Sequence, residues 1–302
     1  MKNKGVLFAL AAYILWGFFP LYFKAIQQVS ALQILAHRIA WGFVFTLAVV
    51  LVLRQWKEFR ASVFNRRTFL IYAGASVVLG INWFTYVWAV ITNHVVESSL
   101  GYFINPIVSV LLGVIFLRER LRTFQWVAIA MVTAGVVYLT ITFGQLPWIS
   151  LVLAVTFGFY GLLKKIAPLG ALHGITLETA VLTIPSLAYL LIVNANGTGT
   201  FGHSTPLLDF LLVLSGPVTA IPLLLFATGA RRIPLTTIGL LQYIAPTLQF
   251  LLGVLVFHEP FDQSRLIGFM IIWLALVLFS VENLLARRRT PSAAPIPAEI
   301  SE

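Results

Sequence analysis

Apolar stretches long enough to cross a bilayer make up almost the whole chain, separated by short clusters of charged or turn-forming residues. About 20 apolar residues in a helix span the hydrocarbon core of a membrane. Residues 44–53 and 269–279 lack the alternating polarity of an outer-membrane strand, and a helix satisfies its own backbone hydrogen bonds in lipid. The sequence therefore predicts an all-α polytopic membrane protein. We expect ten transmembrane helices, over residues 5–23, 32–53, 69–90, 98–117, 123–141, 147–164, 172–193, 207–229, 236–257 and 264–285.

The charge of the chain is low and unevenly distributed. Only 10% of the 302 residues are charged, whereas a soluble domain carries roughly 25%. The net charge of +10 comes mainly from Lys and Arg residues before the first expected helix, after the last one, and in every second connection between helices. If ten helices alternate in direction, these residues lie on one side, and positively charged loops stay in the cytoplasm. We therefore expect both termini to be cytoplasmic and no nucleic acid to be a partner.

The ends of the chain and its missing motifs narrow the possibilities further. The apolar stretch 5–23 follows two lysines but precedes no small-residue cleavage site, so we interpret it as a retained helix and not as a signal peptide. Residues 287–302 begin with arginines and continue with Pro and Ala, and we expect a disordered cytoplasmic tail. The sequence contains no cysteine, no Walker-type loop and no HExxH spacing. We therefore expect no cofactor, no metal site and no catalytic residues.

The second half of the chain repeats the first. Residues 99–120 align with residues 239–260, and both segments contain Leu-Leu-Gly-Val, at 111–114 and at 251–254. We therefore divide the chain into two five-helix repeats, 1–141 and 142–286. Because five is an odd number, the second repeat enters the membrane from the opposite side. Inverted repeats are typical of secondary transporters that expose one site alternately to each face.

Longer segments carry a resemblance to a known family. They are AYILWGFFPLYFK (12–24), LAHRIAW (35–41), SSLGYFINPIVSVLLG (98–113), FGFYGLLKK (157–165), LETAVL (177–182) and TAIPLLLFATGARRIPLTTIGLLQYIAPTLQF (219–250). The chain resembles the drug/metabolite transporter superfamily, within its EamA group, and most closely the RarD family of permeases. The resemblance implies a multi-pass permease of the bacterial inner membrane that exports metabolites.

We therefore expect a secondary-active exporter of small amphipathic organic metabolites or drugs, working by alternating access. An antiporter of anionic metabolites is the main alternative. A membrane-embedded enzyme is a distant alternative, because no convergent catalytic groups are visible. The expected partners are a small-molecule substrate and the lipid bilayer, with the proton gradient as a candidate energy source. The sequence does not distinguish a monomer from a homodimer.

Two charged residues fall within expected membrane spans, where charges are costly and often functional. Arg38 lies near the start of one helix, and Glu178 occupies the equivalent position in the second repeat. They approach the membrane centre from opposite faces, so we expect each to have its own partner. Either they form a structural network, or Arg38 attracts an anionic group and Glu178 carries a proton or binds a cation. His37 points about 100° away from Arg38, so at most one of them faces a central path.

Polar and aromatic residues near the middle of the expected helices are candidates for a substrate cavity. They are Trp16, Asn82, Trp83, Tyr86, Tyr102, Asn105, Tyr160, Phe226, Gln242 and Tyr243. Pro106 and Pro246 follow some of them and free a backbone carbonyl that can serve a ligand. The competing interpretation is structural, because Trp and Tyr also pack helices and lie at membrane interfaces.

Glycines and two helix-terminal glutamates complete the candidate features. Gly101, Gly158, Gly161 and Gly253 are among the glycines that we expect to permit close helix contact. Glu119 and Glu259 end their helices beside basic residues. We expect each to form either a solvated cap or a salt bridge that gates the pathway.

Overall fold

The computed structural model describes residues 2–63, 65–118, 120–230, 232–233 and 235–289. Within these ranges every regular element is a helix. The bounds are α1 Lys2–Gly17, α2 Phe19–Ala25, α3 Ala31–Val52, α4 Trp56–Val63, α5 Arg66–Ile91, α6 Val95–Leu117, α7 Thr123–Phe143, α8 Trp148–Ile166, α9 Ala171–Ala195, α10 Pro206–Ala230, α11 Leu235–Leu241, α12 Ile244–Leu251, a π-helical turn Leu252–Val256 and α13 Gln263–Arg289. Among the described residues, 9 helices are long and apolar enough to cross a membrane, and the shorter apolar helix 244–256 accompanies them. The chain is therefore an all-helical polytopic membrane protein.

Two of the expected membrane helices are broken. The first divides at Phe18 into α1 and α2, and Pro20 lies in the first turn of α2, where its missing N–H is tolerated. The ninth divides between α11 and α12. Pro246 lies in the first turn of α12, and its ring would clash with the carbonyl of Gln242, four residues earlier, in a continuous helix. Pro106, by contrast, remains inside α6.

A short helix that we did not predict, α4, follows α3. Its Phe59 is buried, whereas Trp56, Lys57 and Arg60 are exposed. Phe59 packs with Val50, Tyr72 and Leu177 in a small apolar cluster. The helix is therefore amphipathic and covers the ends of α3, α5 and α9.

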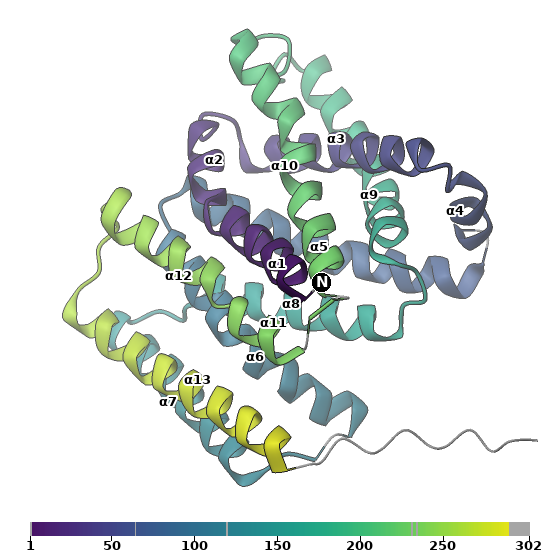
Figure 1. Ribbon diagram of the computed structural model, residues 1–302. Coiled ribbons are helices and arrows are strands. Elements are labelled where there is room, and N and C mark those ends of the chain that lie inside the picture. The colour runs from purple at the N-terminus through teal and green to yellow at the C-terminus, as the bar shows by residue number, and fades with distance from the viewer. Residues whose placement is uncertain (1, 64, 119, 231, 234, 290–302) are drawn as a thin grey trace, which may run out of the picture.

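The helices pack in a few extended pairs (Figure 1). In this view α7 and α13 lie side by side at the lower left, and α3, α9 and α10 form the upper part of the bundle. Helix α6 packs along α8, α5 packs along α8, and α1 packs along α10. Helix α3 contacts both α9 and α10. Helices from the two halves of the sequence thus alternate through the bundle, and neither half is separate from the other.

Several of these contacts depend on glycine. A Cβ atom added to Gly216 of α10 would lie 2.3 Å from the carbonyl carbon of Trp41 in α3. Gly101, Gly158 and Gly253 also lie closely against neighbouring helices, as predicted. The prediction for Gly161 is wrong, because nothing lies within 4 Å of an added Cβ. Gly216 was not predicted, although it makes the closest of these approaches.

Candidate functional site

Arg38 is the centre of a buried cluster between the two halves of the chain. Ser30 caps α3, because its side chain accepts a hydrogen bond from the Gln33 backbone N–H. Arg38 follows two turns later and is only 4% exposed. Its Nε donates a hydrogen bond of 2.7 Å to Thr219 Oγ1 on α10. Its Cζ lies 4.3 Å from the centroid of the Trp83 ring on α5, a cation–π contact.

The rest of the guanidinium is surrounded by aromatic rings. Its Cζ lies 5.4 Å from the Phe23 ring centroid and 5.9 Å from that of Phe19, both on α2. Among the described residues, no carboxylate pairs with Arg38, and its Nη1 is buried without a hydrogen-bond partner. The Tyr86 hydroxyl is likewise buried and unpartnered within the same described part of the chain. The cluster thus holds one cation and two unsatisfied polar groups.

Tyr86 connects Arg38 to the polar contacts between α5, α6 and α8. Its ring centroid lies 6.0 Å from that of Phe23 and 5.8 Å from that of Tyr102 on α6. The Tyr102 hydroxyl donates to Asn82 Oδ1 at 3.5 Å. Asn82 Nδ2 donates to the Leu153 carbonyl at 3.0 Å and to Thr156 Oγ1 at 2.9 Å, both on α8. Asn82 therefore ties α5 to α8 and directs its oxygen toward Tyr102.

Glu178 lies in a second polar cluster, between α8 and α9. It is 0% exposed. Lys164 Nζ donates to its Oε1 at 2.9 Å, and the Tyr160 hydroxyl donates to its Oε2 at 3.0 Å. Phe157 lies between this cluster and the first, with ring centroids 6.0 Å from Tyr160 and 6.1 Å from Tyr102. Arg38 and Glu178 thus have separate partners, as predicted.

Lys164 was not among the predicted site residues. In the sequence it is one of the basic residues at the end of the expected helix 147–164, and in the structure it lies in the last turn of α8. Its Nζ is 4.7 Å from the Tyr72 ring centroid on α5. The connection between α8 and α9 is short, so the end of α8 lies close to the first turns of α9, and the long Lys164 side chain reaches Glu178. The signal available in the sequence was this short connection beside a buried carboxylate. Thr219, the partner of Arg38, carried no such signal.

The remaining candidates make other contacts. Trp16 of α1 and Phe226 of α10 pack together, with ring centroids 5.6 Å apart. Asn105 accepts a hydrogen bond from Ser109, one turn along α6, at 2.9 Å. Gln242 lies in the break between α11 and α12. The Tyr243 hydroxyl is 3.5 Å from Ser280 Oγ on α13.

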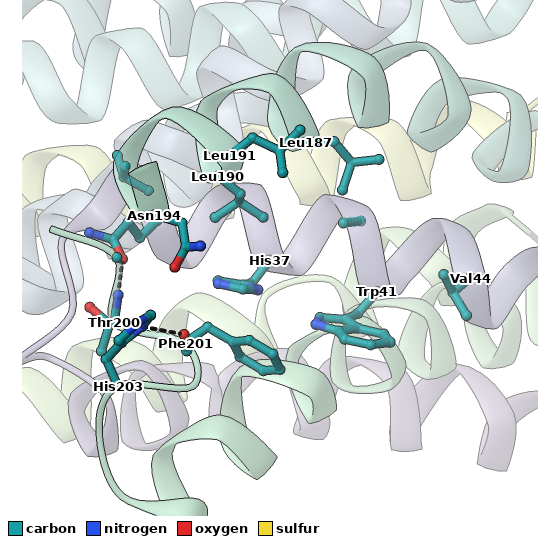
Figure 2. A pocket seen from close by; sticks show the side chains of 14 residues that line it. His37, Trp41, Val44, Leu187, Leu190, Leu191, Asn194, Thr200, Phe201 and His203 are labelled. Atoms are coloured by element: carbon teal, nitrogen blue, oxygen red, sulfur yellow. Dashed lines mark hydrogen bonds between the residues drawn. The ribbon is translucent and has the colours of Figure 1, made fainter. Parts of the chain in front are cut away.

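A pocket of about 490 Å³ lies on the opposite face of α3 from Arg38. Figure 2 shows His37 and Trp41 directed toward Phe201 of the α9–α10 connection, with leucines of α9 forming the other wall. The His37 and Phe201 ring centroids are 5.0 Å apart. Adjacent residues of α3 thus face different surroundings, His37 the pocket and Arg38 the interior. The walls include Val44 and Leu191, which are 52% and 70% exposed, so the pocket opens on the apolar outside of the bundle.

Glu259, in the connection between the π-helical turn and α13, caps the N-terminus of α6. It is 6% exposed, and its two carboxylate oxygens accept the backbone N–H groups of Val95 at 2.6 Å and of Val96 at 2.7 Å. These N–H groups begin α6, where the helix dipole favours an anion. The prediction of a solvated cap or a salt bridge is therefore wrong for Glu259. Glu119 lies outside the described residues.

Comparison with known proteins identifies the family. The EamA-like transporter family matches residues 3–141. The uncharacterized transporter YojE of Bacillus subtilis is 45% identical over 300 residues, which cover 96% of this chain and 98% of that protein. Protein RarD of Escherichia coli is 41% identical over 288 residues, 95% of this chain and 97% of that protein. The chain belongs to the EamA-like transporter family.

The resemblance found in the sequence segments is thus confirmed, including its RarD branch. A solved crystal structure also shares the fold of this EamA-like chain. The two superpose with a TM-score of 0.58 at 20% sequence identity, covering 95% of this chain and 99% of the other. The match to the EamA-like transporter family and the high identity to proteins named as transporters show that the chain is a membrane transporter.

Proposed function

We propose that this EamA-family protein is a secondary-active exporter of small amphipathic organic molecules in the bacterial inner membrane. The observation that carries the proposal is the Arg38 cluster. Helices α2, α3, α5 and α6 from the first half and α10 from the second half supply a buried cation, tyrosine hydroxyls and aromatic rings to one place. Buried polar groups at membrane depth are costly and mark substrate pathways. An aromatic surface with few polar groups suits an amphipathic ligand.

We further propose that residues 1–141 and 142–286 form inverted repeats and that the protein works by alternating access. The pattern of helix packing supports this. If α1 corresponds to α8, α3 to α9, α5 to α10 and α6 to α12, then three of the extended contacts between the halves have counterparts. The α6–α8 contact corresponds to α1–α12, the α1–α10 contact to α5–α8, and the α3–α10 contact to α5–α9. Two such halves can exchange conformations around one site.

The proposal includes an orientation and an energy source. Lys and Arg residues are concentrated at the end of the bundle that carries the start of α1, α4, residues 120–122 and the end of α13, which we call the basic end. The positive-inside rule makes this end cytoplasmic. The opposite end carries the Glu259 cap. The Lys164–Glu178 pair lies nearer the basic end, where Glu178 is the candidate for exchanging a proton with the cytoplasm.

Alternating access can be tested without knowing the substrate. In Glu259→Ala, the loss of the cap should open the opposite end, so hydrogen exchange at residues 92–98 should increase. If the ends are coupled, exchange at residues 53–63 and 167–172, at the basic end, should decrease at the same time. A membrane protein that only frays locally would show the first change without the second, and that result would refute the proposal.

Asp209→Ala provides a matched control. The Asp209 carboxylate lies at the same end but bonds the backbone of its own connection, at Gly202. Its loss should increase exchange locally and leave the basic end unchanged. Export itself is measured by comparing the metabolites that cells retain with and without the protein. Equal retention of every metabolite would contradict an exporter.

A further inference from the structure

The Arg38 guanidinium is incompletely compensated by the protein. Its hydrogen bond to the neutral Thr219 hydroxyl and its cation–π contact with Trp83 supply no opposite charge. Arg38 takes part in neither the Arg122–Glu282 nor the Lys164–Glu178 ion pair. A buried charge normally has a paired and hydrogen-bonded partner, because desolvation penalises an isolated one severely. The cluster therefore favours an anion that the protein itself does not provide.

Two unsatisfied polar groups show where such an anion would bind. Arg38 Nη1 and the Tyr86 hydroxyl are the buried atoms without partners in this cluster, as far as the described residues extend. Trp83 and Tyr86 are three residues apart on α5 and therefore share a helix face. Trp83 lies under the guanidinium. Phe23 also contacts the guanidinium, and Tyr86 lies beside Phe23. Each of the two groups can donate a hydrogen bond, so an acceptor that reached both would satisfy both.

The neighbouring polar groups already have hydrogen-bond partners. The Tyr102 hydroxyl donates to Asn82, and the Tyr22 hydroxyl donates to the Leu211 carbonyl. Asn82 donates to Leu153 and Thr156. The two unsatisfied donors are thus distinct from a network whose members have partners. They do not reflect a general shortage of hydrogen bonds in this region.

The charge and the surroundings define the class of ligand. One guanidinium matches one negative charge, and its planar donors match the geometry of a carboxylate. A dianionic phosphate would bring a second charge into a cluster that holds one cation among the described residues. The rings of Phe19, Phe23 and Trp83 present apolar surface next to the guanidinium. An apolar or aromatic body attached to the carboxylate would pack against them.

We propose that Arg38 and Tyr86 form the anion-binding subsite of this transporter and take the carboxylate of a small aromatic or apolar monocarboxylate. The inference rests on the proposed function, since the cluster is closed in this conformation and a ligand enters when the helices separate. It narrows the amphipathic substrates proposed above to monoanions. Arg38 supplies the charge, Tyr86 supplies a second hydrogen bond, and the rings select the body of the ligand.

Binding to the purified protein in lipid nanodiscs tests the proposal by calorimetry. The probes are benzoate, phenylacetate and indole-3-acetate, each compared with its uncharged amide. At least one carboxylate should bind about tenfold or more tightly than its amide, because hydrogen bonds to charged groups are about that much stronger. Arg38→Gln should abolish the difference, and Arg38→Lys should retain part of it.

Tyr86→Phe should weaken binding of the carboxylate about tenfold, the effect of one such hydrogen bond, and should affect the amide less. Tyr138→Phe is the matched control, because Tyr138 lies on α7 in a different apolar cluster, and it should change neither affinity. A merely structural Arg38 would alter folding without altering the preference for charge. Amides that bind as tightly as carboxylates, a preference that survives in Arg38→Gln, or no binding of any of the three carboxylates would each overturn the proposal.

Failure of this inference is distinguishable from failure of the proposed function. The coupled hydrogen-exchange changes in Glu259→Ala require no ligand. If those changes occur and the carboxylates show no preference over the amides, alternating access stands and the monocarboxylate subsite falls.

Discussion

Replacing Lys164 with methionine would leave the Glu178 carboxylate buried, with Tyr160 as its remaining side-chain donor. Breaking a fully buried ion pair costs about 3–5 kcal/mol, whereas an exposed pair contributes about 0–1 kcal/mol. Glu178 is 0% exposed and the Lys164 side chain 25% exposed, so this pair lies between the two cases. We expect Lys164→Met to lower the free energy of unfolding by about 2–3 kcal/mol. Methionine keeps an apolar stem against Tyr72, so the loss is mainly electrostatic.

A double-mutant cycle isolates the pair. Glu178→Gln in the Lys164→Met background removes the unpaired charge and should restore most of the loss, giving a coupling energy of about 2 kcal/mol. The four proteins are compared by titrating them from mild detergent into sodium dodecyl sulfate and following helicity and tryptophan fluorescence. Lys57→Met, an exposed substitution on α4, should change stability by less than about 0.5 kcal/mol. Additive single effects, with a coupling energy below about 0.5 kcal/mol, would refute the reasoning.

Three further substitutions test the packing, the topology and the energy source. Gly216→Ala should lower the yield of folded protein and its thermal midpoint, because an added Cβ would overlap the backbone of α3. Gly74→Ala should be neutral, because nothing lies within 4 Å of a Cβ added to Gly74. Equal effects in the two variants would contradict this. In this cysteine-free chain, an impermeant thiol reagent outside intact cells should label Asn196→Cys and not Lys57→Cys, and the opposite result would invert the topology. The metabolite comparison identifies a substrate, and Glu178→Gln should still exchange this substrate across vesicle membranes. The variant should lose the substrate accumulation that an imposed pH gradient drives. Accumulation at the wild-type level would leave Glu178 with a structural role.

The membrane helices were predictable because the bilayer fixes their length and removes water as a hydrogen-bond partner. The breaks within them were not. Phe18 interrupts the first span with no proline or glycine at that position, although Gly17 precedes it. Pro106 and Pro246 occupy equivalent repeat positions, yet one remains inside a helix and the other follows a break. The effect of a proline depends on whether neighbouring helices satisfy the freed carbonyl, which local sequence does not encode.

The candidate site was predictable only in part, for a similar reason. The cost of a buried charge singled out Arg38 and Glu178, and both are buried. Their partners could not be found in this way. Thr219 is an ordinary polar residue of an apolar helix, and Lys164 looked like one more basic residue at a helix end. The Thr219 contact depends on which helices lie side by side, and hydropathy does not determine that. The Lys164 contact depends on the short connection between α8 and α9, which was visible in the sequence but is not a feature of hydropathy.

The Glu259 cap has a consequence for how this junction tolerates sequence change. One side of the contact is a carboxylate, and the other is the backbone of Val95 and Val96. Every residue except proline carries that backbone N–H group. Substitution at 95 or 96 by apolar residues of similar size would therefore leave the contact intact, whereas almost any change at 259 would remove it. No compensating charge exchange can repair such a loss, because the partner has no side chain to exchange. In a deep mutational scan, tolerance at this junction should be strongly one-sided, with position 259 nearly invariant and proline the main residue excluded opposite it.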